Sequence, residues 1–466
     1  MIRQKIKYIS PNCYFAGFLQ NIINKSGIKG EVEQKDKEII LKLDDSNEEL
    51  LYKFSELSTK ELPHSIFIED IKTEVVDEEI GNNKIECPPC NISLCPKCLE
   101  DISNPASSHY LDDSLLCTHY SNKEPFYYSD TTNFSPHYSP GASILVCDAS
   151  KIDELFILTN EEKKLLFSIE KPTIKATIKS EEIKELTNRN FIDIKAPYNT
   201  RSTLVAINAK DAQMPYLFFN GGDDLKIVKV QDSFSIIRAN RVAKKLENLN
   251  SNPTLNRFEN LAKEANYSEA VGANLSTKAI SFIVKSSVDT IEPIRFSKFS
   301  LQETLEKMQK DEIRGKLLKN FEKKFEPILK ELYSKEYDLF EALSIILEVN
   351  EIGFKGLSEK SLEFLGNGGL KIDLYFKDGN LDYSALLGSV MSFKLAGAEN
   401  HYIAYSIFEA IGDMAISVLN QLKREFSIKN TIFMGDMFEN SVLYSRILSK
   451  YQLSNPYFSK TIALDD

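Results

Sequence analysis

Five cysteines lie within a short stretch of a chain that is otherwise poor in this residue. The stretch begins Cys-Pro-Pro-Cys-Asn-Ile-Ser-Leu-Cys-Pro-Lys-Cys at Cys87 and closes with Cys-Thr-His at Cys117, and it holds five of the seven cysteines among 466 residues. Thiol pairs two residues apart, followed roughly 15–20 residues later by a Cys/His pair, are typical ligands of a tetrahedral metal ion. Because the intervening loop has few apolar residues, metal binding would supply its folding energy.

This spacing predicts a structural Zn2+ site. Three ligands are Cys95, Cys98 and Cys117, and the fourth is His119 or Cys90. The four cysteines between residues 87 and 98 also suit an iron–sulfur cluster, and cysteines without any metal are the remaining interpretation. We favour zinc. A site closed by four protein ligands has no open position for catalysis, so this metal does not by itself indicate an enzyme.

Composition narrows the class of protein. A formal net charge of −11 argues against a nucleic-acid-binding surface, and a hydrophobic content of 42% is enough for buried cores in several domains. The N-terminal sequence does not resemble a signal peptide. The longest apolar stretch, 402–419, is interrupted by Glu409 and Asp413, which argues against membrane insertion. We therefore expect a cytoplasmic protein with reduced cysteines.

The order of periodic segments predicts a multidomain protein of mixed α/β and α+β class. The first part alternates strand and helix patterns in the order of a ferredoxin-like sandwich, and an acidic linker over 77–84 follows. A short α/β region occupies 143–242, and a larger C-terminal part begins near Leu255. The expected strands are 5–9, 38–43, 65–75, 370–376 and 431–434, and the expected helices are 15–25, 48–57, 301–332, 337–347 and 400–425.

Four short motifs in and around the cysteine stretch have a distinctive order. They are Pro88-Pro89, Cys95-Pro-Lys-Cys98-Leu99, Asn104-Pro105-Ala106 and Cys117-Thr118-His119-Tyr120. Together they resemble the zinc region of the HypF family, the carbamoyltransferases that mature [NiFe]-hydrogenases. Tyr120 stands where the last cysteine of that family belongs, and the second Cys-rich finger of the family is absent.

The resemblance implies four parts. They are an acylphosphatase-like domain over 1–78, a Cys-rich zinc region over 85–140, a truncated YrdC-like segment over 141–245 and a partial actin/hexokinase-like transfer domain over 255–466. The last part is similar to the family in three segments. These are Val271-Gly272-Ala273-Asn274-Leu275, Tyr337 to Leu347 with Phe354-Lys355-Gly356, and Phe433-Met-Gly435-Asp-Met-Phe438-Glu-Asn440.

Several positions that carry chemistry in the family have changed. In the acylphosphatase-like part, Ala16 stands at the position of the phosphate-binding Arg, and the family's Asn falls near Gln34. Loss of the guanidinium removes the bidentate phosphate clamp. In the transfer domain, Asp436 replaces a glycine of the nucleotide-binding turn, where a carboxylate would repel an anion, and Phe408 takes the place of a histidine.

Other candidate residues are assigned no chemistry. The stretch 287–335 contains no histidine, and we interpret its lysines as a solvated helix face rather than a phosphate patch. The glycine turn at 366–369 lacks the Lys-Ser/Thr of a phosphate loop. His109 is a reserve metal ligand, and the remaining histidines are too scattered to form a catalytic group. The lysines and histidines in question are Lys319, Lys323, Lys324, His64, His137 and His401.

These changes favour a pseudoenzyme. The resemblance implies an accessory factor in [NiFe]-hydrogenase maturation, a shortened and degenerate HypF-like scaffold that binds a hydrogenase subunit or another maturation protein. No residue is assigned a catalytic or nucleotide-binding role. The alternative is an active carbamoyltransferase that uses carbamoyl phosphate and ATP to supply ligands of the hydrogenase metal centre. A zinc-ribbon interaction module unrelated to hydrogenase is a third interpretation.

Overall fold

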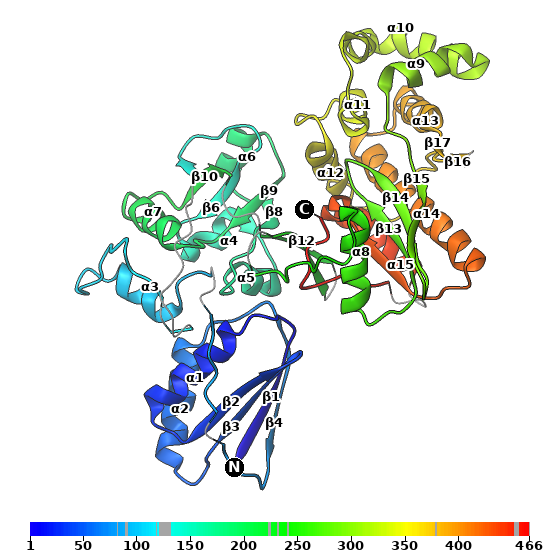
Figure 1. Ribbon diagram of the computed structural model, residues 1–466. Helices are drawn as coiled ribbons and strands as arrows, with labels where there is room; N and C mark the ends of the chain where they lie inside the picture. Colours follow the sequence, from blue (N-terminus) through cyan, green and yellow to red (C-terminus); the bar gives the residue numbers. More distant parts are fainter. Residues whose placement is uncertain are drawn as a thin grey trace. The chain divides into compact units, whose positions relative to one another are not determined.

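The computed structural model divides the chain into two compact units (Figure 1). Unit 1 comprises Met1–Ile227 and Arg238–Lys244, and unit 2 comprises Val228–Ile237 and Lys245–Asp466. The four-part division expected from the sequence remains a prediction. The structure describes residues 1–81, 83–88, 92–117, 119–120, 132–221, 225–230, 233–239, 242–377, 380–451 and 456–465.

The N-terminal part of unit 1 is a four-stranded antiparallel sheet with two helices. Its βαββαβ order and its strand order β2-β3-β1-β4 confirm the predicted ferredoxin-like topology. The helices α1 and α2 lie side by side on one face of the sheet (Figure 1). Strand β2 had no expected counterpart in the sequence. The elements are β1 (Ile2–Tyr8), α1 (Tyr14–Ser26), β2 (Gly30–Lys35), β3 (Glu38–Leu43), α2 (Glu48–Glu61) and β4 (Ile68–Val75).

The rest of unit 1 contains a mixed six-stranded sheet of order β5-β10-β6-β9-β8-β7, in which β6 and β9 are parallel. A short helix, α3, precedes the sheet in sequence. The boundary between the units falls in the β11–β12 hairpin. The elements are α3 (Pro96–Ser103), β5 (Asn133–Ser135), β6 (Ser143–Val146), η1 (Ala149–Lys151), α4 (Ile152–Leu155), β7 (Phe156–Ile157), α5 (Asn160–Leu166), β8 (Ile174–Ile178), α6 (Glu181–Thr187), β9 (Phe191–Lys195), α7 (Thr200–Asp211), β10 (Tyr216–Asn220), β11 (Lys226–Val230) and β12 (Ser233–Arg238).

A fully buried carboxylate joins the two parts of unit 1. Glu170 accepts hydrogen bonds from the Tyr14 hydroxyl (2.7 Å), the Ser65 hydroxyl (2.5 Å) and the Ile66 backbone N–H (3.0 Å). Buried carboxylates are stable in a protein interior when several donors replace water. Since these donors come from the N-terminal sandwich, Glu170 fixes that sandwich to the segment that enters β8.

Unit 2 is built around a sheet of order β15-β14-β13-β18 with helices on both faces. Strand alternation places Val271, Ala273 and Leu275 in the core with α14, whereas a Cβ atom on Gly272 would lie 2.1 Å from the Phe258 ring of α8. The elements are α8 (Pro253–Glu264), β13 (Ala270–Leu275), β14 (Ile280–Lys285), β15 (Thr290–Arg295), α9 (Leu301–Lys310), α10 (Glu312–Ser334), α11 (Leu339–Ile346), α12 (Phe354–Leu362), β16 (Phe376–Lys377), β17 (Asn380–Leu381), α13 (Tyr383–Leu395), α14 (Asn400–Glu425), β18 (Thr431–Met434), η2 (Asp436–Glu439) and α15 (Ser441–Lys450).

The strand expected over 370–376 is wrong, because only Phe376–Lys377 forms a strand there. The N–H of Leu370 donates to the Ser406 hydroxyl of α14 (2.8 Å), and the N–H of Asp373 donates to the Ser389 hydroxyl of α13 (3.0 Å). Helix side chains therefore satisfy backbone groups that a strand would pair with a neighbour.

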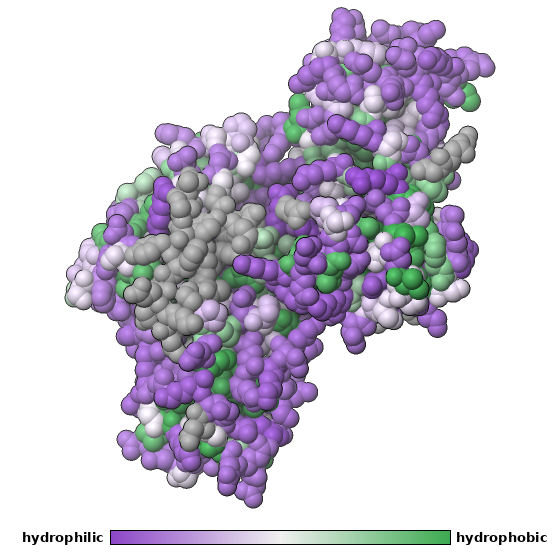
Figure 2. Space-filling view, viewed as in Figure 1, coloured by the Kyte–Doolittle hydropathy of each residue, from purple (hydrophilic) through white to green (hydrophobic). Residues whose placement is uncertain are grey.

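Helix α14 is a core helix despite its apolar length. It is the one helix among the described residues that is long and apolar enough to cross a membrane, yet 67% of its most apolar window is buried inside the fold. On the face shown in Figure 2, hydrophilic residues predominate and apolar residues form small separate patches. The burial identifies α14 as a core helix of unit 2.

Candidate metal centre

Four of the predicted ligands meet at one point in unit 1. The donor atoms of Cys95, Cys98, Cys117 and His119 all lie within 4.8 Å of one another. Cys95 and Cys98 flank the start of α3, and the other two follow the turns after it. The three cysteines are 1–5% exposed and His119 is half-buried. This is the one such group of three or more metal-binding side chains among the described residues.

Local sequence positions these ligands. Cys95 precedes α3 in an extended conformation, and Pro96 then starts the helix, where its missing N–H costs no hydrogen bond. One helical turn brings Cys98 back beside Cys95. After α3, the Asn104 side chain accepts from the N–H of Ala106 (3.0 Å), which turns the chain back toward Cys117. The polar loop is thus a series of turns with few apolar anchors other than Ile102, which is fully buried.

The spacing of the donors fits a tetrahedral ion. The Nδ1 atom of His119 lies 2.9 Å from the Cys95 sulfur, 3.6 Å from the Cys98 sulfur and 4.0 Å from the Cys117 sulfur. Ligands bound to zinc at about 2.3 Å for sulfur and about 2.0 Å for nitrogen are separated by roughly 3.5–3.8 Å. Small side-chain adjustments would therefore suffice for these four residues to hold one ion.

The protonation of the three thiols is strongly linked. Hydrogen bonds from Cys117 and Cys98 lower the pKa of Cys95, while hydrogen bonding within the group raises the pKa of Cys98. The hydrogen bond with Cys95 raises the pKa of Cys117 to about 12. Three thiolates cannot share this small volume without a cation, whereas a divalent metal would favour the ionised form of all of them.

The sequence named two further ligand candidates. Cys90 lies outside the described residues. His109 is exposed and does not belong to the cluster. Tyr120, at the position of the missing cysteine, instead packs its ring against Phe18 of α1 with a centroid distance of 5.6 Å. Gly17 allows this approach, because a Cβ atom there would lie 2.5 Å from the Tyr120 carbonyl oxygen.

The turn after β18 in unit 2 holds the second group of residues that the sequence singled out. Gly435 has φ +112°, and a Cβ atom there would lie 2.2 Å from the Leu275 carbonyl oxygen, so only glycine fits. The next side chain, Asp436, is 5% exposed. Its carboxylate accepts from the N–H (2.7 Å) and the hydroxyl (2.6 Å) of Thr277, in the β13–β14 connection. The donors of Thr277 are therefore bound to a carboxylate of the same chain.

The side chain of Asn440 in the same turn also has hydrogen-bond partners within the protein for both its amide and its oxygen. It is completely buried, and its amide donates to the hydroxyls of Ser358 (2.8 Å) and Ser361 (2.9 Å). Its side-chain oxygen caps α15 by accepting from the N–H of Leu443 (2.9 Å). Sequence reasoning missed Thr277, because its contact with Asp436 spans 159 residues and no local pattern marks it.

The other positions at which the sequence departs from the family are also packed against, or hydrogen-bonded to, residues of this protein. Phe408 of α14 is fully buried and packs edge-on against Phe354 with a centroid distance of 5.8 Å. Ala16 is fully buried in α1. Gln34 of β2 donates its amide to the carbonyls of Ser10 and Asn12 (3.2 Å each), in the loop before α1. That loop thus directs carbonyl oxygens toward Gln34, an arrangement that does not attract an anion.

The scattered histidines have ordinary surroundings. His401 lies in the first turn of α14 and pairs with Glu399 at 3.1 Å, in agreement with its interpretation as a polar residue at a helix start. His64 and His137 are exposed.

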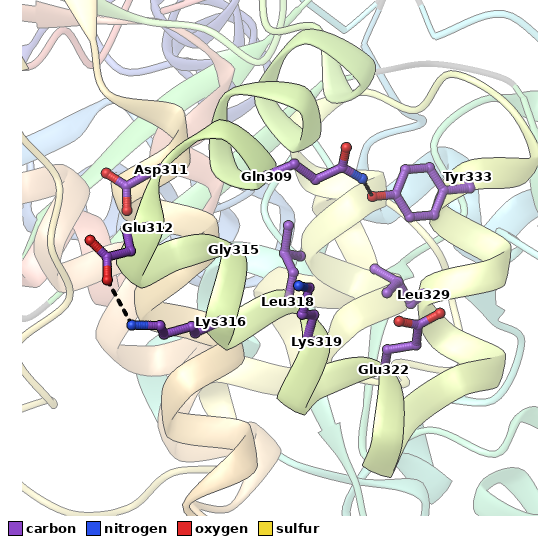
Figure 3. Close-up of a pocket in the computed structure, with 10 residues that line it drawn as sticks. All are labelled: Gln309, Asp311, Glu312, Gly315, Lys316, Leu318, Lys319, Glu322, Leu329 and Tyr333. Atoms are coloured by element: carbon purple, nitrogen blue, oxygen red, sulfur yellow. Dashed lines mark hydrogen bonds and ion pairs between the residues drawn. The ribbon is translucent and has the colours of Figure 1, made fainter.

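Helices α9 and α10 occupy the stretch that lacks histidine, and their residues line a partly open cavity of about 550 Å³. Figure 3 shows the Gln309 amide meeting the Tyr333 hydroxyl (2.6 Å) and Lys316 paired with Glu312 (2.8 Å). Three carboxylates and two lysines line it, so it has no excess of positive charge for a phosphate. The predicted solvated face is confirmed, because Lys319, Lys323 and Lys324 are all exposed.

Comparison with known proteins supports this architecture. HypF from T. kodakarensis superimposes over 100% of this chain and 96% of its own, with a TM-score of 0.66 and 12% identity. A full-length HypF in a phosphate- and nucleotide-bound form gives a TM-score of 0.56 with 13% identity, again over 100% and 96% of the two chains. The chain has the fold of HypF. At these identities the likeness shows the fold alone.

A curated protein is similar in sequence over a short segment. Protein HydE from Wolinella succinogenes is 26% identical over 99 residues, which span 20% of this chain and 18% of that protein. No protein-family model matches the sequence.

Proposed function

We propose that this protein is an accessory factor in [NiFe]-hydrogenase maturation that works by binding rather than by catalysis. It would act in the cytoplasm as a HypF-like scaffold, and a structural Zn2+ ion held by Cys95, Cys98, Cys117 and His119 would stiffen its Cys-rich loop. Its partner would be a hydrogenase subunit or another maturation protein. The HypF fold over the whole chain supports the pathway.

The contact between Asp436 and Thr277 carries the non-catalytic part of the proposal. A turn that binds nucleotide phosphates offers N–H and O–H donors to an anion. Here the carboxylate already satisfies these donors at 2.6–2.7 Å, and its negative charge opposes a phosphate at the same place. The buried Phe408 and the loop closed by Gln34 agree with this interpretation, since each replaces a polar group by a packed or neutral one.

Zinc fits the donor set better than a hard cation does. Three thiols and one imidazole are soft or borderline ligands, whereas magnesium and calcium prefer oxygen. When bound, such an ion would tie α3 and the chain around Cys117 into one rigid loop. With four protein ligands it would have no free position for a substrate.

The test is a gene deletion followed by complementation. We expect loss of [NiFe]-hydrogenase activity in the deletion strain and its recovery with the wild-type gene. Asp436→Asn should also restore activity, because the amide oxygen still accepts from Thr277 and no chemistry depends on the charge. Cys95→Ser should fail to restore it. Full hydrogenase activity in the deletion strain would refute the proposal, and failure of a folded Asp436→Asn protein would favour an active carbamoyltransferase.

A further inference from the structure

A second pair of cysteines lies in unit 1, apart from the metal cluster. Cys87 is 2% exposed, and its thiol donates to the carbonyl oxygen of Cys13 at a distance of 2.8 Å. The two residues are 74 positions apart in the sequence. In the sequence, Cys13 is isolated from the other cysteines. The fold places its backbone against Cys87, the first cysteine of the Cys-Pro-Pro-Cys motif.

The surroundings of the pair are built to bring the sulfur atoms together. Cys13 immediately precedes α1, and Gly17 follows one turn later. A Cβ atom on Gly17 would lie 3.3 Å from the Cys87 sulfur, so glycine leaves room for this sulfur beside the helix. The nearby Cys87 side chain lowers the pKa of the Cys13 thiol. A disulfide needs sulfur atoms about 2.05 Å apart, and because the Cys87 sulfur already lies 2.8 Å from the Cys13 carbonyl oxygen, rotation of the two side chains is the motion that the bond requires.

We propose that Cys13 and Cys87 form a reversible disulfide that fastens the N-terminal sandwich to the chain entering the metal loop. The oxidant is a low-molecular-weight disulfide such as oxidised glutathione. This modification site is distinct from the metal cluster, whose ligands begin at Cys95. It does not depend on the function proposed above.

Exposure assigns the order of the two steps. Cys13 is half-buried and reachable, whereas Cys87 is buried. The Cys13 thiolate attacks one sulfur of the oxidant, which breaks the S–S bond of the oxidant and releases one thiolate. The Cys87 thiolate then attacks the Cys13 sulfur of the mixed disulfide, forms the internal S–S bond and expels the second thiolate. Two protein thiols lose two electrons, and their two protons go to the two released thiolates.

The neighbouring Cys87 side chain favours Cys13 as the first nucleophile. It lowers the pKa of the Cys13 thiol, and a thiol with a lower pKa is ionised to a greater extent. Cys147 provides a matched comparison, because it is also half-buried but burial raises its pKa to about 12. A thiol of that kind reacts slowly.

The experiment equilibrates the metal-loaded full-length protein in glutathione buffers of graded potential, alkylates the remaining thiols and maps linked peptides by mass spectrometry. We expect a Cys13–Cys87 linkage, the loss of two free thiols per chain, unchanged metal content and a rise of several degrees in the unfolding midpoint. Dithiothreitol should reverse all of these changes except the metal content.

Variants separate this linkage from other oxidations. Cys87→Ser should leave Cys13 as a stable mixed disulfide with glutathione, and Cys147→Ser should behave as the wild type. If Cys87→Ser fails to fold, Cys13→Ser at the more exposed position serves in its place and should abolish the linkage. Cys90→Ser should retain the Cys13–Cys87 bond. A Cys87–Cys90 disulfide in the wild type, or a Cys13 that stays reduced while the cysteines of the metal cluster oxidise, would overturn the proposal.

Discussion

The metal cluster of unit 1 and the Asp436 turn of unit 2 differ in the bonding partners of their polar groups. In the cluster, four donor atoms converge within 4.8 Å, and three of them are thiols, which are soft metal ligands. In the turn, the donors of Thr277 already bind the carboxylate of Asp436. The first group of donors could hold an added cation, whereas the donors of the second group are bound to a carboxylate of the same chain.

The largest expected effect is on the metal. Cys95→Ser should reduce bound zinc from about one ion per chain to nearly none, because a tetrahedral structural site does not survive the loss of a thiolate ligand. Elemental analysis of the purified protein measures this. Hydrogen exchange of α3 should rise at the same time, since metal binding supplies the folding energy of this polar loop.

Two controls define that result. Cys147→Ser, outside the cluster, should keep the metal. Cys90→Ser should keep it as well if His119 is the fourth ligand, and His119→Ala should weaken binding strongly. Retention of zinc in both Cys95→Ser and His119→Ala would show that the site is wrongly assigned.

A second effect is the pH dependence of metal binding. Neighbouring thiols raise the pKa of Cys98 and that of Cys117, the latter to about 12, so these thiols bind protons in the metal-free protein. The metal must displace those protons, and affinity therefore falls as the pH falls. We expect a decrease of at least about tenfold per pH unit between pH 8 and pH 6. Competition with a chromophoric chelator measures it, and a flat profile would contradict ligation by thiols.

A smaller effect is expected in the turn. Asp436→Gly, which introduces the glycine that the resemblance implies at this position, leaves the N–H and hydroxyl of the half-buried Thr277 without their acceptor. The free energy of unfolding should decrease by about 1–3 kcal/mol. Denaturant unfolding measures the change, and Asp436→Asn should lose less because one acceptor remains. Stability equal to the wild type in Asp436→Gly would mean that the carboxylate does not close this turn.

The smallest effect is expected at the cavity between α9 and α10. Lys316→Ala removes an exposed pair with Glu312 and should not change the unfolding midpoint measurably. Lys319→Ala should behave in the same way and should not alter phosphate binding. A clear loss of anion binding in either variant would assign this cavity a function that its mixed charges do not predict.

The sequence predicts features whose residues are close together along the chain. The metal ligands span only 25 positions and share a recognisable spacing, and the long helix over 400–425 has a strong period. The strand expected over 370–376 failed for a tertiary reason, because Ser406 and Ser389 on helices take its hydrogen bonds. The local sequence does not indicate hydrogen-bond partners that come from distant helices.

Contacts between residues that are far apart in the sequence could not be predicted from it. Asp436 drew attention as a departure from the family, but its partner Thr277 appears only in the fold. The same is true of Cys13 beside Cys87, and of Glu170, whose three donors come from the N-terminal sandwich. In each case short polar contacts join segments that no sequence periodicity links.

The most direct test of a scaffold without nucleotide chemistry is calorimetric titration of the zinc-loaded protein with ATP in the presence of carbamoyl phosphate and Mg2+. Because Asp436 already accepts the hydrogen bonds of Thr277 in the turn after β18, we expect no heat of nucleotide binding. Pyrophosphate should not appear in the same solution. Saturable heat, or release of pyrophosphate that depends on carbamoyl phosphate, would show that the protein is an active transferase.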